Sequence, residues 1–303
     1  MARERIVFWT SLAGLLVAAA VAYLVLVGPM AAGRPAAPRP PPPPATSSLR
    51  IAAVRGEVTV VRAGVRTRAL EGAELKPDDA IETALGAAVE LAGGGYAVTL
   101  EEGGRFAVGE ITAQLSRFRL AEGLVSARVD DDPARAVEIE GAGASARMHG
   151  GEVSIARRGA VVAVGVRRGR AELSSGGATV ALEAGQQSEA RAGKAPAPPA
   201  PLPPSLLLKV SWPAPTATNE RRIVVKGQAT PGSVVVLGGE KVEVLPDGRF
   251  THVIVLHEGR QQLTARAYGV AGKAASEGPA VVLDTRAPDA RFDTRDLWAP
   301  HRQ

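Results

Sequence analysis

The order of apolar and polar positions divides the chain into a long apolar run and a much longer alternating region. Ile6 to Val27 contains no charged residue, whereas from Leu49 onward apolar and polar positions mostly alternate. About 20 apolar residues in a helix, rising 1.5 Å each, cross the core of a bilayer. Trp9 and Tyr23 lie near the ends of the run, where aromatic rings prefer the headgroup level. The pattern predicts one transmembrane helix over 6–27, followed by β structure.

A cleaved signal peptide is the alternative interpretation of this run. Arg3 and Arg5 supply a basic start, but the A-x-A-like triplet Ala20-Val21-Ala22 lies inside the apolar run. The run is also longer than a signal-peptide core of about 7–15 residues. We therefore favour an uncleaved anchor. Since the nearest positive charges precede the helix, residues 1–5 are expected to form a cytoplasmic tail. The bulk of the chain would then be periplasmic, held by a single pass through the cytoplasmic (inner) membrane.

Proline-rich segments separate the predicted domains. Residues 28–48 include PRPPPPP around Arg39, and residues 191–205 include APAPPAPLPP. Such sequences favour extended polyproline II and act as semi-rigid spacers. We therefore predict linkers at 28–48 and 191–205.

The region 49–190 alternates with a period of two between glycine-rich turns. Gly56-Glu57-Val58-Thr59-Val60 shows the pattern, and Gly93-Gly94-Gly95 is a typical turn. This alternation is typical of half-buried strands, and no stretch shows the apolar spacing of a helix. We predict an all-β block of short strands, including separate strands at Val161–Val166 and Arg170–Leu173.

Within this block the spacing of glycines and apolar residues resembles FecR-type extracytoplasmic domains. The resemblance covers about Val54 to Gln186. It is carried by Gly56-x-Val58-x-Val60, Gly72-x-x-Leu75, Asp78-Asp79-x-Ile81-x-Thr83, Leu120-x-x-Gly123-x-Val125-x-Ala127, Val164-x-Val166-x-x-Gly169-x-Ala171 and Leu182-x-x-Gly185-Gln186.

The resemblance implies a domain of the kind that senses partners outside the cytoplasmic membrane. In signalling members of the family, an anti-sigma domain precedes the membrane helix. Only residues 1–5 precede the helix here. The resemblance therefore implies a FecR-like domain used for binding or scaffolding in the envelope, without the regulatory output.

The region 206–288 predicts a second β domain. About seven short strands at regular spacing are typical of an immunoglobulin-like sandwich. Gly227-x-x-x-Pro231-Gly232, followed by Asp247-Gly248-x-Phe250, is similar to bacterial Ig-like modules. Residues 289–303 are expected to be a tail. The predicted fold class is thus all-β after a single transmembrane helix, with a FecR-like domain and then an Ig-like β-sandwich.

The chain is basic, with a formal net charge of +5 and a pI of about 9.9. Arginines concentrate in two turns of the first β domain. For an exported domain, an anionic wall polymer is a more accessible partner than nucleic acid, although solvated turns are the simpler explanation of such charges. We predict an anionic-polymer patch formed by Arg157, Arg158, Arg167, Arg168 and Arg170.

Motifs for catalysis, cofactors or metals are incomplete in the sequence. Gly141-Ala142-Gly143-Ala144-Ser145-Ala146 matches G-x-G-x-x-A, but no helix pattern follows it, so we interpret it as a turn. His257-Glu258 lacks the second histidine of H-E-x-x-H, and Asp130-Asp131-Asp132 lacks the glycine and glutamate of a calcium loop. The chain has no cysteine, which excludes disulfides and thiolate metal sites. We expect no enzyme activity, no cofactor and no metal.

The sequence therefore predicts a non-catalytic, membrane-anchored envelope protein that presents two β domains to partners. One alternative is a protein that binds peptidoglycan or another polysaccharide. The other is a transmembrane signalling regulator related to FecR sensors. The identity of the partner and the oligomeric state are left open.

Overall fold

The computed structural model describes residues 48–214, 217–245 and 247–286, and there the chain consists of strands and connecting turns. The all-β prediction is confirmed for these residues. The predicted cytoplasmic tail, the anchor at 6–27, almost all of the first linker and the tail at 289–303 lie outside the described residues. Across the described part, no helix has the length and apolar character needed to cross a membrane.

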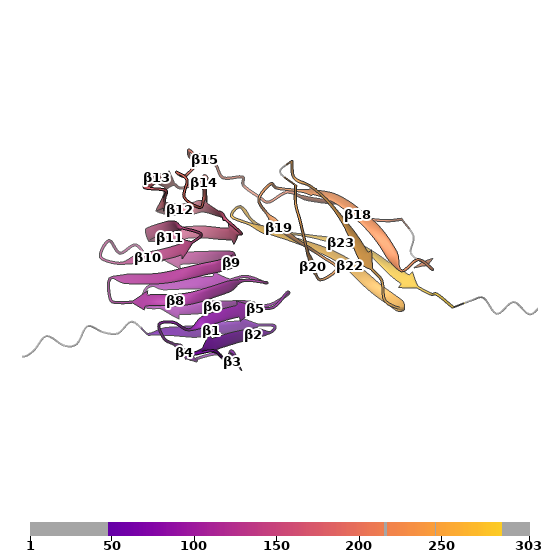
Figure 1. Cartoon of the computed structure of the whole chain (residues 1–303), viewed down its shortest axis with the longest axis horizontal. Coiled ribbons are helices and arrows are strands. Elements are labelled where there is room, and N and C mark those ends of the chain that lie inside the picture. The colour runs from indigo at the N-terminus through magenta and orange to yellow at the C-terminus, as the bar shows by residue number, and fades with distance from the viewer. Residues whose placement is uncertain (1–47, 215–216, 246, 287–303) are drawn as a thin grey trace, which may run out of the picture. The chain divides into compact units, whose positions relative to one another are not determined.

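The first β module is one continuous hydrogen-bonded sheet of 15 strands. In Figure 1 it extends from β1 and β4 at its indigo end to β12, β13 and β14 at its other end. The strands are β1 (Leu49–Arg55), β2 (Val58–Arg62), β3 (Val65–Arg68), β4 (Glu74–Leu75), β5 (Ala80–Thr83), β6 (Ala88–Gly93), β7 (Tyr96–Leu100), β8 (Arg105–Ile111), β9 (Leu115–Val129), β10 (Ala136–Gly141), β11 (Ala144–Arg158), β12 (Val161–Ser175), β13 (Ala178–Glu183), β14 (Gln186–Arg191) and β15 (Ala200–Pro201).

Three strands are much longer than the sequence pattern predicts. β9, β11 and β12 each have 15 residues. The two strands predicted at Val161–Val166 and Arg170–Leu173 are halves of β12, so that prediction is wrong. The sequence pattern hides this continuity. In the first half of each long strand the even-numbered residues are buried, and in the second half the odd-numbered residues are buried, so the parity of the buried positions changes in the middle.

Glycines with positive φ mark where the long strands change parity. In β12, Val162, Val164 and Val166 are buried before the change, and Ala171 and Leu173 are buried after it. Gly123, Gly151 and Gly169 have φ of 106°, 101° and 80° in β9, β11 and β12. A β-carbon on Gly151 would lie 2.0 Å from the carbonyl oxygen of Arg168, so glycine is required there.

The halves of the bent strands enclose one apolar core. On β9, Phe118 and Leu120 are buried before the bend, and Val125 and Ala127 are buried after it. Phe106 on β8 stacks on Phe118 with ring centroids 5.0 Å apart, and both rings are fully buried. The core therefore depends on strands that are paired differently on each side of the bend. β9 pairs with β8 and β10 before it, and with β7 and β11 after it.

The central part of the proline-rich segment that is expected to be the second linker lies along β14. The backbone of Ala197 donates to the carbonyl of Glu189, and β15 pairs with Gln186 and Gln187. Ser188, which is buried, donates its hydroxyl to the carbonyl of Ala197 at 2.6 Å. This stretch is therefore held against the first sheet over several residues.

The second β module consists of two sheets that share one apolar core. One sheet has the order β16-β18-β21, and the other has the order β17-β23-β22-β19-β20. Phe250 on β21 and Leu263 on β22 meet in this core from opposite sheets. The strands are β16 (Leu208–Ser211), β17 (Ala217–Thr218), β18 (Arg222–Ala229), β19 (Val234–Leu237), β20 (Glu240–Val242), β21 (Arg249–Val255), β22 (Gly259–Gly269) and β23 (Gly272–Leu283).

Candidate binding cleft on the first sheet

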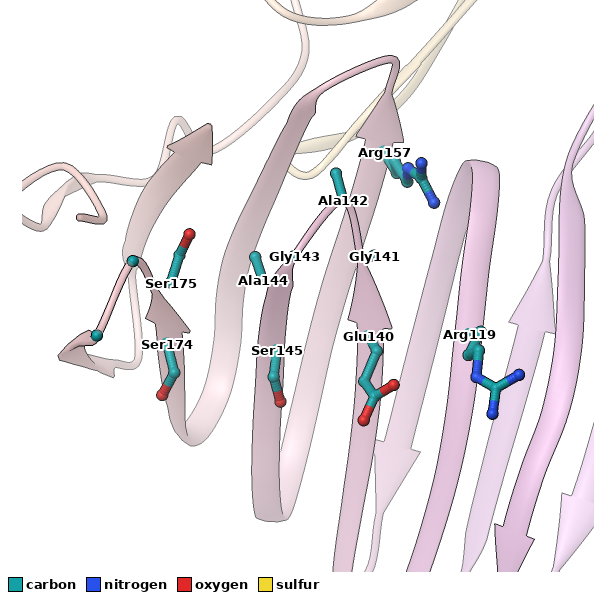
Figure 2. A pocket seen from close by; sticks show the side chains of 12 residues that line it. Arg119, Glu140, Gly141, Ala142, Gly143, Ala144, Ser145, Arg157, Ser174 and Ser175 are labelled. Carbon is teal, nitrogen blue, oxygen red and sulfur yellow. The ribbon is translucent and has the colours of Figure 1, made fainter. Parts of the chain in front are cut away.

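A row of polar side chains crosses four neighbouring strands on the outer face of the first sheet. Glu140 on β10 lies opposite Arg119 on β9 and opposite Ser145 on β11. Ser145 in turn lies opposite Ser174 on β12. The core-facing neighbours of these residues, such as Phe118 and Ile139, are buried. The register therefore brings four separated polar residues into one line, which Figure 2 shows.

The adjacent row is charged and largely neutralises itself. Arg117 on β9 reaches three carboxylates, at 3.5 Å from Glu110, 3.7 Å from Glu138 and 3.2 Å from Glu140. Ser145 donates its hydroxyl to Glu138 at 2.6 Å. The negative charge of Glu140 is consequently compensated by Arg117 rather than by Arg119.

Two tight hairpin turns bound the end of this face. Ala142 and Gly143, between β10 and β11, have φ of 47° and 74°. Gly176 and Gly177, between β12 and β13, have φ of 56° and 78°. Positive φ at both central residues is the signature of the type I′ hairpin turn. The prediction that the G-x-G-x-x-A motif forms a turn is thus confirmed: β10 returns as antiparallel β11.

Between these turns and the polar row lies a cleft of about 560 Å³. This size is within the range of small-molecule sites, about 300–1,000 Å³. Figure 2 shows Arg119 and Glu140 at one side of it and Ser174 at the other. The lining residues are Arg119, Glu140, Gly141, Ala142, Gly143, Ala144, Ser145, Arg157, Ser174, Ser175, Gly176 and Gly177.

The electrostatics of the cleft favour an anion. Arg119 is exposed, and within the described residues its guanidinium has no hydrogen-bond or ion-pair partner. Arg157 is held in place by the carbonyl oxygens of Leu120, at 2.8 Å, and Gly159, at 3.3 Å. Its charge is solvated by dipoles but is not neutralised. Glu140 is the one carboxylate among the described lining residues, and it pairs with Arg117, so these residues carry an excess of positive charge.

The structure does not bring the five predicted patch arginines together. Arg157 and Arg158 end β11, whereas Arg167, Arg168 and Arg170 lie at the bend of β12. From Val162, which pairs with Arg157, the strand runs five residues to Arg167, or about 16 Å. Only Arg157 lines the cleft. Binding of an anionic polymer by the other four stays a prediction.

Most of these arginines already have partners. Arg170 pairs with Glu183 at 2.8 Å, and Arg167 lies 3.5 Å from Glu152. Arg158 donates to the carbonyl of Ser233 at 3.1 Å, and Arg167 donates to that of Ala271 at 3.5 Å. Both acceptors belong to the second module. The first and second modules belong to one compact unit. Arg168 has no partner in the described part of the chain.

Two buried carboxylates that the sequence did not single out lie near these contacts. The side chains of Glu101 and Glu102, in the turn between β7 and β8, are each 4% exposed. Glu101 pairs with Lys273 at 2.6 Å, and Glu102 pairs with Arg266 at 3.1 Å. The partners lie more than 160 positions away in the sequence, so no local pattern could have indicated them.

The remaining sequence motifs are used structurally. The ring Nδ1 of His149 lies 3.1 Å from the carbonyl oxygen of Arg135. Glu258, from the H-E pair, accepts from the Thr285 hydroxyl and lies 3.4 Å from Arg221. Within the described ranges, no group of three His, Cys, Asp or Glu residues is arranged to hold a metal ion.

No family model and no curated protein matches the chain. Two crystal structures of a "putative anti-sigma factor" from Parabacteroides distasonis are similar to it at 18% and 19% identity, each with a TM-score of 0.35. Each likeness covers 38% of this chain and 56% of that one, so the chain spans little more than half of its length. A polysaccharide lyase structure gives 12% identity and a TM-score of 0.20 over 80% of this chain and 40% of the lyase. Likenesses at these scores carry no argument about function.

Proposed function

We propose that the chain is a non-catalytic, membrane-anchored binding and scaffolding protein of the cell envelope. In this proposal residues 6–27 anchor the chain in the cytoplasmic membrane. A FecR-type module, followed by an Ig-like module, lies on the outer side of that membrane. The anchor and the orientation rest on the sequence pattern alone. The binding role is supported by one observation, the positively charged cleft beside Arg119.

The cleft suits a ligand that carries an anionic group and hydroxyls. An arginine without a protein partner can form two parallel hydrogen bonds to a carboxylate. The backbone of the glycine-rich turns and the hydroxyls of Ser174 and Ser175 supply neutral donors and acceptors around it. Among the described residues that line the cleft, none is an aromatic residue on which a neutral sugar ring could stack. We therefore assign it to acidic polysaccharide rather than to neutral glycan.

The strand order supports an Ig-like second module. Immunoglobulin sandwiches place strands A, B and E in one sheet and C, F and G in the other. β16, β18 and β21 occupy the positions of A, B and E, while β19, β22 and β23 occupy those of C, F and G. Such modules commonly act as spacers, which fits a scaffolding role.

A non-catalytic role is supported by how the cleft's polar groups are used. The nearest pairing of a hydroxyl with a base is Ser145 with Glu138. Glu138 also lies 3.7 Å from Arg117, so its carboxylate is already engaged in an ion pair. The Ser174 hydroxyl lies 2.8 Å from that of Thr179. In the described part of the chain, neither serine is hydrogen-bonded to a histidine that could activate it.

Binding by the cleft is tested with the full chain in detergent on immobilised polygalacturonate. We expect retention at low salt that Arg119→Ala weakens at least tenfold. Arg128→Ala is the matched control, because Arg128 is exposed on the same strand outside the cleft. Arg168→Ala tests the member of the predicted patch that has no partner. Equal retention of the wild type and Arg119→Ala would overturn the cleft as the binding site.

The envelope location is tested separately. Protease added to spheroplasts should remove residues 48–286 while a cytosolic control protein survives. If that region survives together with the cytosolic control, the proposed orientation is wrong. This result does not depend on whether the cleft binds polygalacturonate.

A further inference from the structure

One edge of the second module exposes backbone groups that have no partner among the described residues. β21 is the last strand of the sheet β16-β18-β21. Its pairing with β18 is bounded by hydrogen bonds from Leu256 to Arg221 and from Ala229 to Gly248, both 2.8 Å. Hydrogen-bonded pairs alternate along an antiparallel ladder, so the register fixes which residues face β18 and which face away.

The register directs the amides of four β21 residues away from β18: Arg249, Thr251, Val253 and Val255. Arg249 is satisfied locally, since its carbonyl accepts from Leu245 and its amide donates to Asp247. For Thr251, Val253 and Val255, no hydrogen-bond partner for the outward amide or carbonyl occurs in the described residues. Three consecutive outward positions therefore form an open hydrogen-bonding edge.

Beside this edge the outer face of the sheet carries exposed valines, with Arg222 and Lys226 on β18 on the same face. Val253 is 44% exposed and Val255 is 57% exposed. Val224 on β18, which lies opposite Val253, is 54% exposed. Natural edge strands usually carry lysine, proline or a bulge that prevents pairing. Thr251, Val253 and Val255 carry no charge, and the pairing of β18 with β21 has no register shift.

We infer that β21 is a self-association edge, on which a second copy of this chain adds its own β21 antiparallel. A two-fold axis at Val253 places Val253 opposite its copy and Val255 opposite Thr251 of the copy. This register is the one that satisfies all three open positions at once, and a shift by two residues leaves some open. β-Branched residues then face β-branched residues, with no like charges opposed. The inference is independent of the proposed cleft.

The predicted contact is small. One strand pair buries much less than the roughly 1,600 Å² of a typical stable interface. We therefore expect a weak dimer whose population rises with protein concentration. A covalent trap is the suitable probe, and the chain offers a clean background because it contains no cysteine.

The test introduces single cysteines into the full chain in detergent. Val253→Cys places two sulfur atoms across the axis, where α-carbons of a hydrogen-bonded pair lie about 5.5 Å apart, within disulfide range. Val224→Cys is the matched control. It is an exposed valine on the same face, but three strand spacings, about 14 Å, would separate it from its copy.

After mild oxidation we expect a disulfide-linked dimer for Val253→Cys and at least tenfold less for Val224→Cys. Equal cross-linking of both variants, or none in either, would overturn the inference. Sedimentation of Val253→Lys gives an independent readout, because this exposed substitution should leave the fold intact and remove the concentration-dependent dimer. If Val253→Lys and the wild type show the same association, the edge does not mediate it.

Discussion

The guanidinium of Arg62 holds the carboxylate of Asp79 through two hydrogen bonds, 2.8 Å from Nε and 2.6 Å from Nη2. Asp79 is 2% exposed, whereas Arg62 is 51% exposed. The backbone amide of Lys76 donates a third hydrogen bond to the same carboxylate at 2.8 Å. The hydrogen bond from Arg62 is the main reason that the pKa of Asp79 lies below its usual range, while burial opposes this shift.

Removing Arg62 is therefore expected to make the protein more sensitive to acid. Because the pKa of Asp79 is lower in the folded state, its stabilisation is present above the unfolded value of about 3.9 and is lost as the pH falls through the folded value. Arg62→Ala should raise the folded pKa and move the acid-unfolding midpoint to higher pH. It should also lower the stability at neutral pH, because the buried carboxylate of Asp79 loses two of its hydrogen bonds.

Circular dichroism followed from pH 7 to pH 2 measures this effect. Arg66→Ala is the control, because Arg66 pairs with the more exposed carboxylate of Glu82 at 3.1 Å. We expect its acid midpoint to stay close to that of the wild type. An unchanged midpoint in Arg62→Ala would show that the pair does not govern acid stability.

Glycine at the bend of β11 gives a second prediction. Gly151→Ala would place a β-carbon 2.0 Å from the carbonyl oxygen of Arg168 at a φ of 101°. Strain from φ and from overpacking each cost about 1–3 kcal/mol, so we expect a loss of roughly 2–6 kcal/mol. Gly185→Ala is matched in φ, at 81°, but meets no atom within 4 Å. Chemical denaturation should show a clearly smaller loss for this control.

The elements that the sequence predicted well are those in which burial alternates locally. Val58, Val60 and Ile81, in the FecR-like pattern, are all core residues. Thr83, in the same pattern, donates its hydroxyl to the carbonyl of Glu101 at 2.6 Å. In this chain these positions serve packing and a buried hydrogen bond, so the pattern does not reveal a binding site.

The features that the sequence did not reveal depend on register and on distant contacts. The continuity of β12 is hidden because its buried positions change parity near Gly169. Arg119 becomes distinctive only because Glu140, which lies opposite it in the parallel pairing of β9 with β10, forms its ion pair with Arg117 instead. The five patch arginines are close in sequence, but an extended strand separates them in space.

The buried carboxylates between the two modules give a third prediction. Arg266→Ala leaves Glu102 with a 4% exposed side chain and without its ion-pair partner. Breaking a buried pair costs about 3–5 kcal/mol, and we expect a loss toward the lower end because Arg266 itself is 41% exposed. Differential scanning calorimetry of the full chain should show a clear fall in Tm.

Lys241→Ala is the control for this prediction. Lys241 pairs with Glu122 at 2.8 Å, but Glu122 is 56% exposed. Exposed pairs contribute about 0–1 kcal/mol, so its Tm should change little. Equal effects of the two variants would show that burial of Glu102 is not what makes its pair important.

The stacked rings of the first core give the last prediction. Phe118→Ala removes a fully buried ring that contacts both Phe106, at 5.0 Å between centroids, and Tyr96, at 6.0 Å. Deleting a buried phenylalanine costs about 3–5 kcal/mol. Phe118→Leu should cost much less, because it keeps most of the apolar volume.

Phe118 and Arg119 are neighbours on β9, so Phe118→Leu should also disturb the cleft. We expect urea denaturation to rank the stabilities as wild type, Phe118→Leu and Phe118→Ala. Polygalacturonate retention should follow the same order, and retention that is independent of this ranking would separate the cleft from the core beneath it.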